Sequence, residues 1–313
     1  MLDILFSNPF IVFVLGSFLL FYSSDLLVEN SIVVSNKFNI PRFIIGGTII
    51  ALGTSLPEII VSVLANVKGN SGVSIGNIIG SNIANIGLVL GVSLFFKNII
   101  INKNNYEYLF NTFWLMLITV AFYVIILNGN LLFIHGCFFI LMYCLYFFLH
   151  VKYFKSDDNI DEYRGVISYA IIKLIIGFLL IYYGSQLFID GAIGIANIVG
   201  VNDVAVGLTI VALGTSAPEL LVSINAIKKN ESMIAIGNIF GSNIANIVFA
   251  GGISCIVKSI YINTDQIFIY SSIMLFLTLF LSLVIIFSKK IYKIYSLIFT
   301  SVYIIFIYMN FNN

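Results

Sequence analysis

Two short motifs place acidic, hydroxyl and proline residues inside segments that are otherwise apolar. Residues 51–58 read ALGTSLPE and residues 212–219 read ALGTSAPE, so seven of the eight positions are identical. The motifs end at Glu58 and Glu219, and an ionisable group at membrane depth is costly unless it faces a cavity or a partner. We therefore predict that both carboxylates belong to a functional site.

Each motif also contains a proline that disturbs the surrounding helix. Pro57 and Pro218 have no N–H group and crowd the preceding turn, so the carbonyls of Gly53 and Gly214 lose their helical partners. In hydrocarbon a freed carbonyl must find a partner in protein, water or an ion. Broken helices with acids and free carbonyls, in matching positions of two halves, indicate the ion site of a transporter.

A second duplicated motif supplies a polar stripe. Residues 76–85 read GNIIGSNIAN and residues 237–246 read GNIFGSNIAN. Each copy has an Asn, a Ser and an Asn four residues apart on one helix face, namely Asn77, Ser81 and Asn85, and Asn238, Ser242 and Asn246. Such a stripe could line an ion path or form hydrogen bonds between helices, and the GxxxG spacing of the glycines predicts close helix packing.

The residue types around the two glutamates favour a hard cation. Carboxylates, hydroxyls and backbone carbonyls are oxygen donors, the ligand set of calcium and sodium. No thiolate or imidazole lies near the motifs in sequence, which argues against zinc, copper or iron. We predict no cofactor apart from the transported ions. The three cysteines lie in apolar runs and are predicted to be buried packing residues, and His135 and His150 to be interfacial.

Composition excludes a soluble globular protein. Hydrophobic residues make up 60% of the chain and charged residues 9%, and the mean hydropathy is +1.08. A soluble domain would carry about a quarter charged residues. The net charge is +1, with Lys and Arg scattered singly in loops, so no nucleic-acid surface is expected. The surroundings are a lipid bilayer, and no protein partner can be inferred.

Apolar runs predict an all-α polytopic membrane protein with ten transmembrane helices, at about 20 residues each. The runs are 10–33, 43–66, 73–96, 107–127, 131–150, 166–189, 204–227, 233–257, 267–287 and 291–309. The loops after helices one, three, five, seven and nine hold twelve Lys and Arg residues, and the other loops hold only Lys68 and Lys258. Since positive loops stay in the cytoplasm, both termini are predicted to lie outside a plasma membrane.

A constant offset of 161 positions relates the two halves of the chain. It aligns Glu58 with Glu219 and Glu29 with Asp190. We predict a first five-helix repeat at residues 1–150, a short cytoplasmic linker at 151–165 and a second repeat at 166–313. An odd number of spans forces the second copy to enter the membrane from the opposite side, so the repeats are inverted. The linker is acidic, and a solvated linker is favoured over a cation-binding segment.

Two acids stand apart from the motifs. Asp25 and Glu29 lie one helical turn apart in helix one, and Gln186 and Asp190 occupy the matching places in helix six. Glu29 and Asp190 approach the ends of their helices and are predicted to be interfacial anchors. Asp25 lies deeper, so an accessory proton or cation role stays open for it.

The motifs ALGTSLPE and GNIIGSNIAN, each duplicated, resemble the calcium/cation antiporter superfamily and specifically its sodium/calcium exchanger branch, prokaryotic type. The resemblance implies that helices two, three, seven and eight enclose the ions, and that helices one and six slide past this core to alternate access. It implies that Glu58 and Glu219 are the central calcium ligands. The other implied ligands are the carbonyls of Thr54 and Thr215 and, for flanking sodium or proton sites, Ser55, Ser81, Asn85, Ser216, Ser242 and Asn246.

One position departs from the family pattern. Exchangers of this branch often carry an Asp where this chain has Asn246. With only two glutamates, the site is neutralised by one calcium ion, two sodium ions or two protons, whereas three sodium ions leave a positive charge in a low dielectric. We therefore expect about two monovalent ions per calcium, or protons in place of sodium.

These patterns predict a secondary antiporter that moves Ca²⁺ in exchange for Na⁺. The alternative is a Ca²⁺/H⁺ or K⁺-dependent antiporter. A membrane-embedded enzyme is disfavoured because neither a nucleophile, a metal-binding His set nor an Asp-rich diphosphate motif is visible, and an ATP-driven pump because the chain has no GxxxxGK loop. A cation channel would also carry acids along a path, and flux that requires a counter-ion would separate the two.

Overall fold

The computed structural model describes residues 8–100, 106–154, 167–199, 212–261, 264–288 and 290–312, which are almost entirely helical. The helices, in chain order, are α2 (Pro9–Phe38), α3 (Arg42–Ile45), η1 (Gly46–Ile50), α4 (Ala51–Thr54), α5 (Leu56–Val67), α6 (Ser71–Ala84), η2 (Asn85–Leu90), α7 (Gly91–Phe96), α8 (Tyr106–Ile126), α9 (Phe133–Tyr153), α10 (Ile167–Val199), α12 (Ala212–Thr215), α13 (Ala217–Lys228), α14 (Ser232–Ala245), η4 (Asn246–Gly251), α15 (Gly252–Val257), α16 (Thr264–Phe287) and α17 (Ile294–Asn312), where η marks a π-helical segment.

Several of these helices are long and apolar enough to cross a membrane. Within the described residues there are seven such stretches, or eight if the bent pair Arg42–Thr54 and Leu56–Val67 is one span. The apolar part of α17 is shorter, and the span expected at 204–227 is described only from residue 212 onward. The multi-pass membrane class is therefore confirmed, and the count of ten spans stays a prediction. The acidic residues of the expected linker lie outside the described residues.

The chain enters its first long helix through a local cap. The side chain of Asn8 accepts a hydrogen bond from the backbone N–H of Phe10 at 3.0 Å, and Pro9 occupies the first turn. The helix ends at Asn39, whose φ of 52° is left-handed, a conformation that Asn tolerates better than most residues. This turn ends α2 and redirects the chain into α3.

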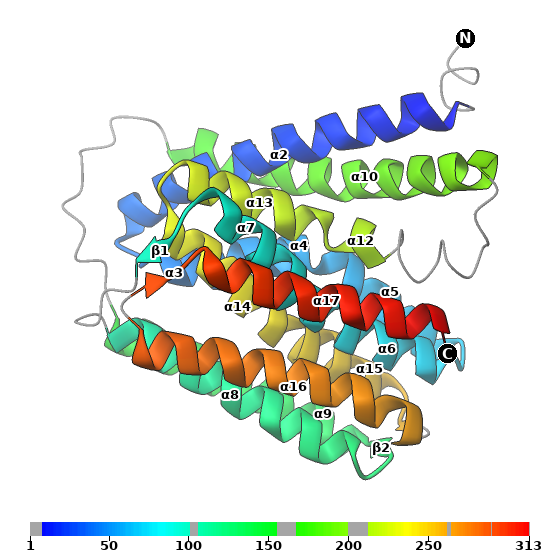
Figure 1. The fold of residues 1–313 in the computed structure, drawn as a ribbon. Coiled ribbons are helices and arrows are strands. Elements are labelled where there is room, and N and C mark those ends of the chain that lie inside the picture. Colours follow the sequence, from blue (N-terminus) through cyan, green and yellow to red (C-terminus); the bar gives the residue numbers. More distant parts are fainter. Residues whose placement is uncertain are drawn as a thin grey trace.

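The two longest helices, α2 and α10, lie side by side along the upper edge of Figure 1. Glycines allow their backbones to meet: a Cβ at Gly16 would lie 2.7 Å from the Cα of Phe188, and one at Gly191 would lie 2.6 Å from the Cα of Phe13. At 1.5 Å per residue, helices of 30 and 33 residues are roughly 45–50 Å long. The pair is therefore longer than the hydrocarbon core, which is about 30 Å thick.

The core of the protein is built from the helices that carry the duplicated motifs. The helix α5 contacts η4 and α13 contacts η2, while α14 contacts α4 and α12 contacts α6. These contacts thus form two matched pairs, in which each contact made by the first half has a counterpart made by the second. The helices α8, α9 and α16 lie along the opposite edge from α2 and α10 (Figure 1), and α17 packs against α7 and η2.

Close packing of glycines brings α14 against α3 and η1. A Cβ at Gly241 would lie 2.5 Å from both the Cα and the carbonyl carbon of Gly47, and one at Gly237 would lie 2.9 Å from the backbone nitrogen of Gly47. The packing predicted from the GxxxG spacing is therefore confirmed for this motif. For Gly76, no described atom lies within 4 Å of such a Cβ.

Two short strand pairs join the halves of the chain. β1 (Ile99–Ile100) pairs with β4 (Lys290–Ile291), and β2 (Asn130–Leu131) pairs with β3 (Ile260–Tyr261), both antiparallel. In each pair, one strand comes from the first half and one from the second. No pattern in the sequence predicts these strands.

Two packing predictions are corrected by the fold. Cys255 is buried, but Cys137 is only partly buried and Cys144 is exposed on the face of α9 that also exposes Leu141 and Phe148. An apolar run that faces lipid does not need to bury every member. His150 is fully buried rather than interfacial, because it meets a carboxylate from α8.

Candidate functional site

Two helix breaks position the duplicated glutamates. Ser55 and Ser216 interrupt the helices with backbone angles φ −85°, ψ 4° and φ −87°, ψ 0°. Pro57 lies in the first turn of α5, and the helices on either side of the first break are bent by 49°. The predicted breaks are therefore confirmed. Glu58 stands in the first turn of α5, where the positive end of the helix dipole stabilises a carboxylate.

The two carboxylates are buried and face each other's helix break. Glu58 and Glu219 are each 1% exposed. The hydroxyl of Ser55 donates to Oε1 of Glu219 at 2.9 Å, so the serine of one break contacts the acid of the other. Thr215 lies beside Glu58, and Thr54 lies beside Glu219. A cation beside two buried carboxylates stabilises their charged forms.

Asn77 and Asn238 support the turns that carry the acids. The side-chain nitrogen of Asn77 donates to the backbone oxygen of Glu58 at 3.0 Å and to the hydroxyl of Ser62 at 2.9 Å. Asn238 makes the equivalent bonds in the second half, at 3.4 Å and 3.1 Å. In addition, the hydroxyl of Thr54 donates to the side-chain oxygen of Asn238 at 3.3 Å. The nitrogens of both asparagines thus fix the backbone beside the glutamates.

Several buried polar atoms around the acids have no hydrogen-bond partner. They are one oxygen each of Glu58 and Glu219, both amide atoms of Asn85, the amide oxygen of Asn246 and the hydroxyls of Ser216 and Ser242. Leaving a buried polar group unpaired costs about 1–3 kcal/mol, so a cluster of such atoms needs a specific reason. Carboxylate, amide and hydroxyl oxygens are the donors that a hard cation binds.

The second predicted stripe lies on the helices that pack against the breaks. Ser81 and Ser242 are 6% and 0% exposed on α6 and α14, and Asn85 and Asn246 begin the π-helical segments η2 and η4. Such segments often mark functional positions. The structure therefore places all twelve predicted residues on four stretches of chain, namely the two broken segments 51–67 and 212–228 and the two helical segments 71–96 and 232–257. Their role as ligands stays a prediction.

Sequence reasoning missed one neighbour of this stripe, Asn82. Its side-chain oxygen accepts a hydrogen bond from the amide nitrogen of Asn246 at 3.3 Å, across the boundary between the halves. Its own amide nitrogen contacts the sulfur of Met274 at 3.6 Å. The bond to Asn82 orients the amide of Asn246. The signal that could have identified it is its place inside the duplicated GSNIAN segment.

Asp25 and Glu29 do not join this cluster. Both form ion pairs with Lys229 at the end of α13, and Asn225 donates to Asp25 at 3.4 Å. The structure therefore shows a helix-to-helix contact for Asp25. The predicted accessory role in transport stays a hypothesis.

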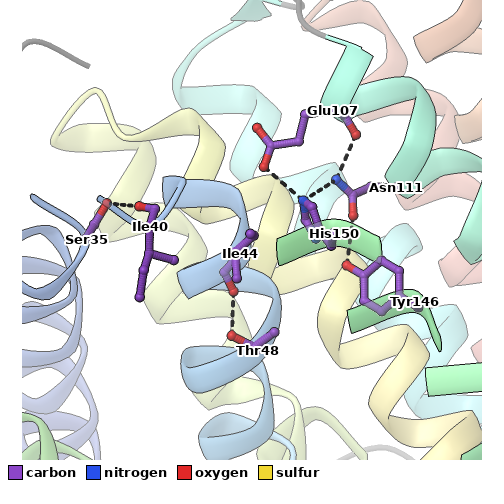
Figure 2. Close-up of polar contacts among 8 residues, drawn as sticks. All are labelled: Ser35, Ile40, Ile44, Thr48, Glu107, Asn111, Tyr146 and His150. Atoms are coloured by element: carbon purple, nitrogen blue, oxygen red, sulfur yellow. Dashed lines mark hydrogen bonds and ion pairs between the residues drawn. The ribbon is translucent and has the colours of Figure 1, made fainter. Parts of the chain in front are cut away.

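A second buried polar cluster, drawn in Figure 2, consists of Glu107, Asn111, Tyr146 and His150. Nε2 of His150 lies 3.0 Å from Oε1 of Glu107, and the hydroxyl of Tyr146 donates to the side-chain oxygen of Asn111 at 2.8 Å. These side chains join α8 to α9, and the ring of His150 packs on Phe43 of α3 with 6.0 Å between ring centres. The cluster thus braces the helix that leads to the first break.

Among the described residues, no group of three or more His, Cys, Asp and Glu side chains is placed to hold a metal. The candidate site instead combines two carboxylates with neutral oxygen donors, which provides two negative charges at most. Carboxylate and neutral oxygen donors are the ligands that hard cations prefer.

Comparisons with known proteins identify relatives over most of the chain. A family model described as sodium/calcium exchanger protein matches residues 8–152 and 169–312. The uncharacterized membrane protein MJ0091 of Methanocaldococcus jannaschii is 40% identical over 237 residues, 75% of this chain and 77% of the relative. The sodium/calcium exchanger MaX1 of Methanosarcina acetivorans is 29% identical over 319 residues, 87% of this chain and 89% of the relative.

Solved structures of the sodium-calcium exchanger NCX_Mj are also similar. One of them, from a crystal soaked with Na⁺ and Ca²⁺, has a TM-score of 0.83 and 35% sequence identity, and the match covers 94% of this chain and 95% of that one. Another, soaked with Na⁺ and Sr²⁺, has a TM-score of 0.84 at 34% identity.

Proposed function

Because this chain belongs to the sodium/calcium exchanger family, we propose that it carries Ca²⁺ across the plasma membrane in exchange for Na⁺ by alternating access. Family and fold make it a membrane cation exchanger rather than an enzyme. The proposed exchange of Ca²⁺ for Na⁺ rests on one observation, the pair of buried carboxylates Glu58 and Glu219, each with one unpaired oxygen. Two facing acids of this kind suit one divalent cation or two monovalent ones.

In this proposal the glutamates hold the calcium ion together with oxygens of Thr54 and Thr215. The flanking sodium sites use Ser55, Asn85 and Ser81 with their counterparts Ser216, Asn246 and Ser242. Asn77 and Asn238 complete the ligand set where their oxygens reach an ion, and their nitrogens hold the glutamate turns in place. The unpaired atoms of Asn85, Asn246, Ser216 and Ser242 support this assignment.

We further propose ten spans arranged as two inverted five-helix repeats, residues 1–150 and 166–313, with a cytoplasmic linker and external termini. The hydrogen bonds of Asn77 and Asn238 support this arrangement, since each asparagine makes the same two bonds within its own half. The crossed strand pairs support it as well. Ions then reach the site from either side as the long helices α2 and α10 move against the core.

The neutral amide at Asn246 bears on the counter-ion. A third carboxylate would suit three sodium ions, whereas two carboxylates suit two monovalent ions for each calcium. Exchange of Ca²⁺ for H⁺ is the second candidate, because protons on Glu58 and Glu219 would neutralise the site equally well. Potassium dependence belongs to the same alternative.

The test is calcium uptake by purified protein in lipid vesicles. Vesicles are loaded with sodium, with potassium or with buffer under a set proton gradient, and radioactive calcium is added outside. Glu58→Gln and Glu219→Gln are compared with Glu107→Gln, which changes a buried acid in the second polar cluster. We expect uptake that requires internal sodium and that each of the first two substitutions abolishes.

The outcomes separate the candidates. Uptake driven by the proton gradient alone would replace sodium with protons as the counter-ion. Calcium flux without any internal counter-ion would contradict exchange and indicate a channel. Full activity in both Glu58→Gln and Glu219→Gln would refute the site.

A further inference from the structure

The middle of α2 is tied to the C-terminal end of α13 by charged and polar side chains. Lys229 caps the C-terminus of α13 and forms ion pairs with Asp25 and with Glu29, the latter at 2.7 Å between Nζ and Oε1. The amide nitrogen of Asn225, one turn earlier, donates to the hydroxyl of Ser24 at 3.1 Å. These contacts lie outside the site that holds the two glutamates.

The offset between the halves gives this cluster a counterpart. Lys68 is the equivalent of Lys229, and it caps α5 as Lys229 caps α13. Asp190 on α10 is the equivalent of Glu29 on α2. Lys68 and Asp190 are both exposed, and in the part of the chain that the structure describes no ion pair joins them. One half therefore makes the contact and the other does not.

The long helices link the two positions mechanically. The backbones of α2 and α10 pack directly on each other at Gly16 and Gly191, so a movement of one helix is expected to carry the other with it. In the described state α2 packs along α13, whereas α10 contacts the core through the short segments α4 and α12 and part of α13. A movement that brings α10 to the end of α5 therefore draws α2 away from the end of α13.

We propose that Lys229 and Lys68 are alternating latches that set which side of the membrane the site opens to. Lys229 holds α2 to α13 in the described state, and Lys68 forms an ion pair with Asp190 in the opposite state. The inference rests on the proposed alternating access, in which two states related by the repeats need equivalent contacts. With the Lys229 loop in the cytoplasm, the described state is the one closed to the cytoplasm.

The two latches are unequal in strength. Gln186 stands where the first half has Asp25, and Leu64 stands where the second half has Asn225. The Lys68 latch thus has a single acid and lacks the amide, so the sequence favours the Lys229-latched state. Asp25 is 43% exposed, and pairs this exposed contribute little each. Removing Asp25 should therefore shift the ratio of the two states only about two- to fivefold.

Cross-linking of paired cysteines measures the two states directly. In a chain whose three cysteines are replaced by alanine, Lys68→Cys with Asp190→Cys reports the opposite state, because a short bifunctional thiol reagent joins them only when they meet. The rate of cross-linking follows the population of that state. We expect Asp25→Asn to raise this rate about two- to fivefold, and Lys229→Gln to raise it at least as much.

Matched substitutions control for general effects. Lys228→Gln alters the neighbouring lysine, which lies over the ring of Phe96 instead, and should leave the rate unchanged. Lys229→Arg keeps the charge and should also leave it near the starting value. In the reverse test, Gln186→Asp should slow cross-linking of Glu29→Cys with Lys229→Cys, because it adds the missing acid to the Lys68 latch.

Two results would overturn the latches. The first is a Lys68–Asp190 cysteine pair that never cross-links while the Glu29–Lys229 cysteine pair does. The second is a rate that neither Asp25→Asn nor Lys229→Gln changes. Cross-linking needs no transport, so shifted rates without sodium-driven calcium uptake would refute the exchange function alone. Sodium-driven uptake with unshifted rates would refute the latches alone.

Discussion

Gly241→Ala tests whether the close approach of α14 to η1 holds the site together. The new Cβ would lie 2.5 Å from the Cα and the carbonyl carbon of Gly47, whereas ordinary contact begins near 3.4 Å. Both neighbouring atoms belong to the backbone, so the helices must separate by roughly 1 Å. Overpacking of this kind costs about 1–3 kcal/mol. The separation also loosens the hydrogen bond between Thr54 and Asn238, which spans the same contact.

The assay is thermal unfolding in detergent, followed by calcium uptake. For a chain of this size we expect the midpoint of unfolding to fall by about 2–5 °C, with weaker apparent calcium affinity. Gly251→Ala is the matched control, since its Cβ would meet Ile78 and Phe122 only at 3.6 Å, which is ordinary contact. An unfolding midpoint for Gly241→Ala equal to that of Gly251→Ala would refute the reasoning.

Two further substitutions probe the polar contacts. Ser55→Ala removes the 2.9 Å hydrogen bond to Glu219. Because a bond to a charged group contributes about 1.5–3 kcal/mol, we expect the apparent calcium affinity to fall about tenfold or more. An unchanged affinity in vesicle uptake would contradict this expectation. Glu107→Ala leaves His150 without its carboxylate partner. We expect the free energy of unfolding to fall by about 1–3 kcal/mol and the calcium affinity to stay unchanged. A lower calcium affinity with unchanged thermal stability would instead assign Glu107 to transport.

The site was predictable from sequence because its chemistry is local and duplicated. Glu58, Ser55 and Pro57 stand within four residues, and proline must disturb the helix wherever it lies in the fold. An acid in an apolar run is conspicuous in the same way. The position of Glu58 in the first turn of α5 follows directly from the break.

Contacts between distant segments could not be predicted in this way. Glu107 and His150 come from the ends of two separate helices, and no pattern in the sequence predicts that they are in contact. The support given by Asn77 to the backbone of Glu58 depends on how two helices cross. The strand pairs escaped notice because two-residue strands leave no alternating pattern.

The same strand pairs impose an order on biosynthesis. Ile99 pairs with Ile291, so β1 has no strand partner until about 190 further residues have been made. At about 5–20 residues per second this interval is on the order of 10–40 seconds. Throughout that time β1 is an unpaired edge, the kind of backbone that pairs readily with the wrong strand. Pairing of β1 therefore has to wait for the second half of the chain to be made and inserted.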